Sequence, residues 1–274
     1  MRYIRTITTA FLLLLLATLP GCEQGAGTEG ETLSQEAAEL YRTGKYDRAV
    51  VVAKKALEVA EKNAGLNHLD VATSLNNLAA LYRAQGQYAE VEPLYKRSLE
   101  INEKALGLNH PDVAISLNNL ALLYVAQGQY AQAEPLFKRA LAVYEKALGP
   151  DHPDVAASLN NLAELYNAQV KYAEAEPLFK RSLAIKEKAL GPDHPNVATS
   201  LNNLASLYYD QGHYAQAEPF FKRALTIREK ALGPDHPDVA MSLENLAALY
   251  RAMKRDEEAK ALEQWAARIR AIQQ

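Results

Sequence analysis

A pair of adjacent asparagines recurs at one fixed point of a repeated motif. The motif Ser-Leu-Asn-Asn-Leu-Ala begins at Ser74, Ser116, Ser158 and Ser200, 42 residues apart, and the variant Ser-Leu-Glu-Asn-Leu-Ala begins at Ser242. A carboxamide offers a hydrogen-bond donor and an acceptor without a fixed charge. A row of such groups can bind a polypeptide main chain, or it can join neighbouring elements of the protein itself.

Both interpretations of the asparagines stay open from the sequence. In the first, the amides grip the main chain of an extended peptide, which needs donors and acceptors together. In the second, one asparagine of each pair bonds to a neighbouring helix and fixes the step between repeats. Each asparagine can also take a separate task. The residues concerned are Asn76, Asn77, Asn118, Asn119, Asn160, Asn161, Asn202, Asn203 and Asn245.

Five histidines also recur once per repeat, at predicted helix starts. A metal site needs ligands that converge on one ion, whereas these histidines are expected to be spaced along the stack. The sequence therefore predicts structural connectors and no metal site. The histidines are His68, His110, His152, His194 and His236.

Candidate catalytic groups are few. Asp210 and His213 lie three residues apart, and Glu164 is predicted about one repeat away. This pattern is common and has no accompanying nucleophile. The chain contains no GxSxG, no phosphate-binding glycine loop, no HExxH and no CxxC motif. The sequence predicts a protein without catalytic residues and without a cofactor.

The only cysteine follows a segment typical of a secretory leader. Arg2 and Arg5 precede an apolar run, which ends in Leu-Pro-Gly before Cys22. This ending resembles the bacterial lipobox, whose cysteine is acylated. We expect a lipoprotein signal peptide at 1–21 and an acylated Cys22 with a flexible tether over 22–30. An ordinary leader or an uncleaved anchor are the alternatives.

Each repeat is predicted to form two helices. In the third copy, Leu117, Leu120, Ala121 and Tyr124 have the spacing of one helical face. Pro111 suits the first position of that helix. A glycine turn then leads into a second helix, which ends at a glycine. Its expected buried face comprises Ala133, Phe137, Ala140, Val143 and Tyr144, and Pro135 is expected just inside its start.

Composition agrees with a folded repeat array. Hydrophobic residues make up 49% of the 274 residues and charged residues 23%, which is ordinary for a globular chain. The formal charge of -3 excludes a strongly basic nucleic-acid footprint. We expect no nucleic-acid partner.

The recurring small and aromatic residues resemble the tetratricopeptide repeat. Ala121, Tyr124, Gly128, Ala133 and Phe137 match its pattern. The 42-residue period, the LNNLA core and the ALGxxHPDVA connector are similar to the repeats of kinesin light chains. This resemblance implies an all-α, right-handed superhelical solenoid of about six antiparallel helix pairs over 31–274. The predicted repeats span about 31–66, 67–108, 109–150, 151–192, 193–234 and 235–274.

In that family, the side of each first helix opposite its packed face lines a concave groove. The asparagines fall on this side. Groove residues that differ between copies should set specificity, with an apolar middle and a polar continuation. They are Arg83, Ile115, Leu122, Val125, Glu164, Asn167, Tyr209 and Arg251.

Two functions follow as expectations. The first is a non-catalytic protein-protein interaction scaffold, which is tethered to a bacterial envelope membrane through Cys22 and binds an extended segment of a protein or peptide partner in the asparagine-lined groove. The second is a structural spacer of an envelope complex that uses its convex or end surfaces. Either would face the periplasm or the cell surface, and Glu23 after the cysteine slightly favours the outer membrane.

Overall fold

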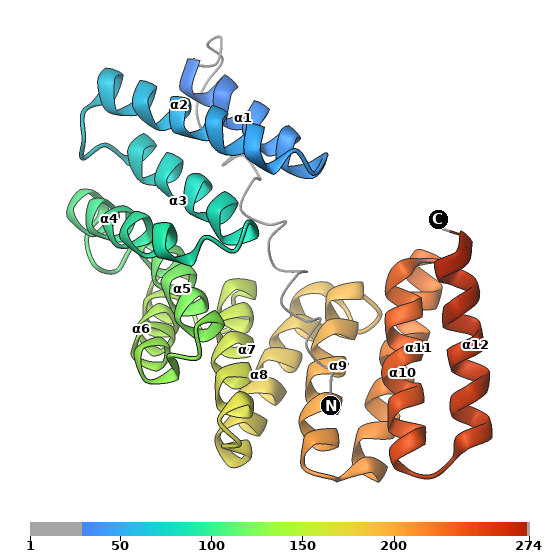
Figure 1. The fold of residues 1–274 in the computed structure, drawn as a ribbon. Helices are drawn as coiled ribbons and strands as arrows, with labels where there is room; N and C mark the ends of the chain where they lie inside the picture. Colours follow the sequence, from blue (N-terminus) through green and yellow to red (C-terminus); the bar gives the residue numbers. More distant parts are fainter. Residues whose placement is uncertain (1–28, 273–274) are drawn as a thin grey trace. The chain divides into compact units, whose positions relative to one another are not determined.

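A computed structural model describes residues 29–272 (Figure 1). Every regular element in this range is an α-helix. The predicted all-α fold is therefore confirmed. The leader, Cys22 and most of the tether lie outside the described residues.

The chain divides into two compact units, residues 1–127 and 128–274, and each is described by itself. The helices of unit 1 are α1 (Glu29–Arg42), α2 (Tyr46–Ala64), α3 (Leu69–Ala84), α4 (Tyr88–Leu106) and α5 (Pro111–Ala126). The helices of unit 2 are α6 (Tyr130–Leu148), α7 (Pro153–Ala168), α8 (Tyr172–Leu190), α9 (Pro195–Asp210), α10 (Tyr214–Leu232), α11 (Pro237–Ala252) and α12 (Asp256–Ile272).

Helices pack in consecutive pairs within each unit (Figure 1). In unit 1, α1 packs on α2 and α3 on α4, and α2 and α4 each contact the following helix. In unit 2, the pairs are α7 with α8, α9 with α10 and α11 with α12, joined by contacts of α6 with α7, α8 with α9 and α10 with α11. We call the odd-numbered helices A helices and the even-numbered ones B helices.

A histidine caps the start of each A helix from α3 to α11. In each case, its Nδ1 accepts a hydrogen bond from the main-chain N–H two residues later, at 3.1 to 3.3 Å. The side chain thus satisfies one of the N–H groups that a helix start leaves unpaired. Proline follows four of the five histidines and holds them in the extended conformation that a cap requires. The prediction of structural histidines is confirmed.

The predicted helix faces are buried. Leu117, Leu120, Ala121 and Tyr124 of α5 are all buried in unit 1. The second predicted face is buried in unit 2, through Ala133, Phe137, Ala140, Val143 and Tyr144 of α6. The A-helix positions are apolar and buried in α3, α7, α9 and α11 too, whereas the B-helix positions include buried polar residues such as Ser98, Ser182 and Arg228. These faces place the opposite side of each A helix away from the core, which positions the candidate site.

Pro135 lies deeper in its helix than the sequence predicted. Helix α6 begins at Tyr130, directly after the turn, so the proline occupies the second turn and not the first. A proline there has no N–H to donate to the preceding turn. An ion pair between Glu134 and Lys138, at 2.7 Å, links the residues on either side of it.

The turn between A and B helices requires a left-handed backbone residue. Glycine supplies it at Gly128 and Gly212, with φ of 73° and 77°. Val170 and Lys254 stand at the same position with φ of 62° and 61°. The left-handed region costs a non-glycine residue on the order of 1–3 kcal/mol, and a β-branched residue such as valine is especially unsuited to it. The turn before α8 is therefore strained.

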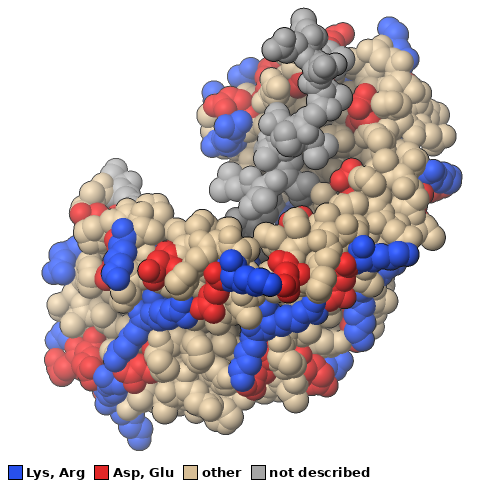
Figure 2. Space-filling view, turned by 180° about the vertical axis from the view of Figure 1, so that it is seen from behind, with Lys and Arg blue, Asp and Glu red and all other residues tan. Residues whose placement is uncertain are grey.

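Charged side chains of both signs share the surface. In Figure 2, Lys and Arg lie beside Asp and Glu over much of the visible face of the described residues. Many are neighbours on one helix, such as Glu176 and Lys180 at 2.7 Å. Within residues 29–272, no helix is both long and apolar enough to cross a membrane.

Candidate functional site

Asparagines of successive A helices bond to each other in unit 2. Asn203 of α9 donates from Nδ2 to Oδ1 of Asn160 on α7, at 2.8 Å. Asn245 of α11 donates in the same way to Asn202 on α9, also at 2.8 Å. The second asparagine of one copy thus bonds to the first asparagine of the preceding copy. These two bonds fix the step between neighbouring A helices.

The paired asparagines of unit 2 are also well covered. Asn160, Asn161, Asn202 and Asn203 are only 1% to 8% exposed. Their amides therefore offer a partner little surface. For Asn160, Asn202 and Asn203, which also bond to a neighbouring A helix, the structure favours stacking over peptide gripping.

Unit 1 differs, because its first asparagines keep unused acceptors. Within the described residues, Oδ1 of Asn76 and Oδ1 of Asn118 are buried and accept no hydrogen bond. Their side chains as a whole are only partly buried, whereas Asn119 is buried. A buried acceptor without a donor costs roughly 1–3 kcal/mol, and nearly all such atoms in proteins have a partner. Both residues are partly exposed as a whole, so a rotation of the amide would bring each oxygen to the surface, where a ligand would reach it.

A carboxyl group lies among the amides of unit 2. Glu164 of α7 accepts hydrogen bonds from Nδ2 of Asn160, at 2.7 Å, and from Nδ2 of Asn203, at 3.1 Å. Burial raises the pKa of Glu164 to about 7, although the Asn160 bond and the positive charge of Lys186 both favour its ionised form. The charge of this site therefore changes near neutral pH.

Asp210 forms a second carboxyl site on the neighbouring A helix. Its Oδ2 accepts a hydrogen bond from Nδ2 of Asn167, at 2.9 Å, and burial raises its pKa. His213 instead lies near Glu176, whose pKa it helps to lower. The bonded neighbours of both carboxyls are thus carboxamides, which bind hydrogen-bonding groups but do not relay protons as an imidazole does.

The other predicted site residues fall in three groups. Ile115, Leu122 and Val125 are partly exposed on α5, so unit 1 carries the expected apolar positions. Arg83 is partly buried at the end of α3. Tyr209 is partly buried on α9, where its ring packs against Tyr214 with centroids 5.4 Å apart.

Arg251 is exposed on α11 and pairs with carboxylates of the last helix. Its guanidinium donates to both carboxylate oxygens of Glu263 on α12, at 3.1 and 2.8 Å, and to Asp256, at 3.1 Å. These two carboxylates hold the Arg251 guanidinium within the last helix pair. Contact of Arg251 with a partner stays a prediction.

Sequence reasoning missed a recurring side-chain cluster, which we call the latch. In each latch, a tyrosine near the end of an A helix donates to a glutamate of the preceding B helix, at 2.8 to 3.2 Å. A lysine four residues after that glutamate pairs with it, at 2.6 to 2.7 Å. The latches are Tyr124-Glu92-Lys96, Tyr166-Glu134-Lys138, Tyr208-Glu176-Lys180 and Tyr250-Glu218-Lys222.

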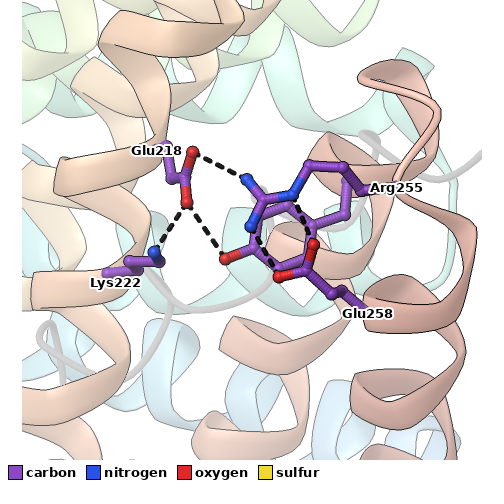
Figure 3. Close-up of polar contacts among 5 residues, drawn as sticks. Glu218, Lys222, Arg255 and Glu258 are labelled. Atoms are coloured by element: carbon purple, nitrogen blue, oxygen red, sulfur yellow. Dashed lines mark hydrogen bonds and ion pairs between the residues drawn. The ribbon is translucent and has the colours of Figure 1, made fainter.

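The latch of the last repeat has an additional cation. Figure 3 shows Glu218 between Lys222 and Arg255, whose Nη1 donates to Glu218 Oε2 at 2.9 Å. The guanidinium also lies 3.9 Å from the centroid of the Tyr250 ring and donates two hydrogen bonds to Glu258, each at 2.6 Å. The tyrosine and the Glu-Pro pair both recur every 42 residues. This shared period is the sequence signal from which the latch could have been predicted.

Comparisons with known proteins agree with this geometry. A family profile for the tetratricopeptide repeat matches residues 28–104, 70–146, 112–188, 154–230 and 216–271. A comparison with curated proteins found no significant match.

Solved structures of the same fold include a protein from Podosopora anserina, described as a candidate kinesin light chain with nearly identical repeats. It is 31% identical over 76% of this chain and 98% of its own, with a TM-score of 0.65. BtubC (BKLC) from P. vanneervenii is 26% identical over 90% and 93% of the two chains, with a TM-score of 0.68. PilW, described as a type IV pilus biogenesis factor, is 21% identical over 87% and 92%, with a TM-score of 0.63, and shows the fold alone. The chain therefore belongs to the tetratricopeptide-repeat family and has repeats of the kinesin-light-chain-like kind.

Proposed function

We propose that the chain is a non-catalytic scaffold that binds an extended segment of a protein partner on the exposed side of its A helices. The observation that carries this proposal is the pair of buried acceptors in unit 1, Oδ1 of Asn76 and Oδ1 of Asn118. Main-chain N–H groups of an extended segment would supply the missing donors once the two amides rotate toward the surface. Binding would then remove a cost that the free protein bears.

Side chains beside these amides would set the choice of partner. In unit 1, Ile115, Leu122 and Val125 offer partly exposed apolar contacts on the helix that carries Asn118. In unit 2, Glu164 and Asp210 offer acceptors. An apolar anchor with separate polar contacts is common in protein interfaces.

A test replaces Asn118 with leucine, which has a similar shape but no acceptor. We expect the Asn118→Leu chain to capture its partner about tenfold less and to unfold no more easily than the natural chain, since it loses an unsatisfied group. Asn203→Leu is the matched control. It breaks a formed bond to Asn160, so we expect it to lower the free energy of unfolding by about 1–2 kcal/mol.

Capture can be measured by photo-crosslinking in the native host, with the reactive residue at Val125 on α5 or at exposed Ala184 on α8. Crosslinks from Val125 that weaken in the Asn118→Leu background would support the proposal. Unchanged capture in that background, with Asn118→Leu destabilised, would show that the amide is structural and would sink it.

A spacer is the second candidate function. Its support is the set of contacts that hold the repeats in step, namely the asparagine bonds of unit 2 and the four latches. A spacer needs a fixed repeat geometry but no occupied groove. Crosslinks from Ala184 without any from Val125 would favour this second function.

We also propose that Cys22 is acylated and tethers the chain to a bacterial envelope membrane, the outer membrane by preference. The support is the order of a basic start, an apolar run and a small-residue ending before the cysteine. A fold relative, PilW, is described as a type IV pilus biogenesis factor, which makes an envelope assembly a reasonable place to look for partners.

The tether proposal predicts the result of Cys22→Ala. In this proposal, the affinity of the chain for the membrane comes from the acyl chains on Cys22, whose CH₂ groups are buried in the bilayer. We expect palmitate labelling to disappear and most of the chain to move from the membrane fraction to the soluble fraction. A natural chain that stays in the membrane fraction without palmitate labelling would contradict lipidation and would favour the uncleaved anchor.

A further inference from the structure

The interface between α2 and α3 in unit 1 has a latch without its carboxylate. Tyr82 at the end of α3 and Lys54 of α2 stand 42 residues before Tyr124 and Lys96, which both bind Glu92. The residue that corresponds to Glu92 is Val50. The tyrosine and the lysine of the latch are therefore present, and the group that they hold elsewhere is absent.

An open pocket of about 390 Å³ lies at this position. Its lining includes Val50 and Lys54 from α2, Tyr82 from α3 and Gln87 from the turn before α4. The Lys54 Nζ is 5.6 Å from the centroid of the Tyr82 ring. The neighbouring Tyr82 hydroxyl is the main cause of the raised pKa of Lys54. The pocket thus presents a cation, a hydroxyl and an amide.

Two carboxylates line the same pocket but do not take the place of the missing one. Asp47 accepts a hydrogen bond from Nε2 of Gln85, at 2.8 Å. Glu90 of α4 acts on Lys54 only as a weak Coulomb attraction. Neither carboxylate stands at the position of Val50 on α2, where a latch glutamate would begin.

We propose that this pocket binds the side-chain carboxylate of a glutamate from a partner protein. The other four latches show the geometry that such a group would adopt, with the tyrosine hydroxyl donating to it and the lysine ammonium paired with it. Charge-assisted hydrogen bonds of this kind are the stronger ones in proteins. Gln87 would add an amide donor from the turn. The inference goes beyond the proposed function and does not depend on the asparagines.

The chain itself offers a matched pair of variants. Val50→Glu supplies the carboxylate from within and should block the pocket. Glu92→Val removes the carboxylate of the next latch and should create a second pocket at Tyr124 and Lys96. Val50→Ala leaves the pocket open and controls for the loss of valine.

The probe is N-acetylglutamate N-methylamide, titrated into isotope-labelled protein at constant ionic strength while the Tyr82 and Lys54 NMR signals are followed. We expect saturable shifts in the natural chain and in Val50→Ala, at least tenfold weaker binding in Val50→Glu, and new shifts of Tyr124 and Lys96 in Glu92→Val.

Three results would overturn the proposal. One is equal binding of the uncharged glutamine analogue, which would show that the carboxylate is not recognised. Another is tighter binding of N-acetylalanine, which carries the α-carboxylate of a chain terminus. That result would show that the pocket binds a C-terminus and not a glutamate side chain. The third is unchanged binding in Val50→Glu, provided that its spectrum outside α1 to α4 matches that of the natural chain.

Discussion

Replacing Glu164 with glutamine is expected to raise the free energy of unfolding at pH 8 by about 3 kcal/mol, since each pKa unit corresponds to 1.36 kcal/mol. The pKa of this carboxyl is about 7 in the folded protein, against an ordinary value of 4.5. The folded chain therefore holds a proton between these values that the unfolded chain has released. The stability associated with Glu164 is fully present below pH 4.5 and is lost as the pH rises through 7.

Glutamine keeps the local hydrogen bonds but cannot ionise. In the natural chain, Asn160 and Asn203 donate hydrogen bonds to Oε1 of Glu164. The carbonyl oxygen of glutamine can accept the same two hydrogen bonds. The two proteins should therefore have similar stability at pH 4.5 and should diverge as the pH rises. Urea unfolding at pH 4.5, 6, 7 and 8 measures this difference, with Glu174→Gln on the exposed surface of α8 as the control. A constant difference across these pH values would contradict the raised pKa.

Local signals in the sequence predicted the helices well. The spacing of Leu117, Leu120, Ala121 and Tyr124 defines a helical face within a few turns, and this face is buried. A proline after His110 marks the start of the same helix, which begins at Pro111. Such signals depend only on neighbours along the chain, so one sequence is enough to find them.

The site residues depend on the step between repeats, which the sequence does not specify. Asn203 donates a hydrogen bond to Asn160, 43 positions earlier. This bond depends on how far α9 is shifted along its axis relative to α7. The pKa of Glu164 depends on burial by the same packing. The helical period placed these residues on one side of their helices. It could not decide whether the asparagines bind a peptide or bond to a neighbouring helix.

The latches lay within reach of sequence reasoning. Tyr250 and Glu218 are 32 residues apart and belong to different repeats. Their pairing could be predicted only by comparing equivalent positions in all copies of the repeat. The same comparison would have found Val50 as the break in the glutamate series among the B helices that an A helix follows. The glutamate of each latch stands directly before Pro135 or its equivalent.

Removing Glu218 is expected to weaken the last repeat more than any other single latch change. Glu218 accepts from Tyr250 at 3.1 Å and from Arg255 at 2.9 Å, and it pairs with Lys222 at 2.6 Å. Its side chain is only 18% exposed. Because hydrogen bonds to charged groups contribute roughly 1.5–3 kcal/mol each and are not additive, we expect Glu218→Ala to lower the free energy of unfolding by about 2–3 kcal/mol.

The pH dependence of this loss has the opposite sign to that of Glu164. Pairing with Lys222 is the main cause that lowers the pKa of Glu218, so its contribution is present above the ordinary value and is lost as the pH falls through the lowered one. Glu218→Ala should therefore differ most from the natural chain near pH 7 and least in acid.

Hydrogen exchange at pH 7 can locate the effect, because local opening exposes the amides of the affected helices. Faster exchange is expected in α11 and α12, with α3 and α4 unchanged. Glu100→Ala is the control, since it removes a glutamate that pairs with a lysine four residues later at 2.5 Å on an exposed surface, where such pairs contribute little. Equal effects of the two substitutions would show that the latch adds nothing beyond an ordinary surface ion pair, and that burial of the A and B helices alone holds the last repeat in place.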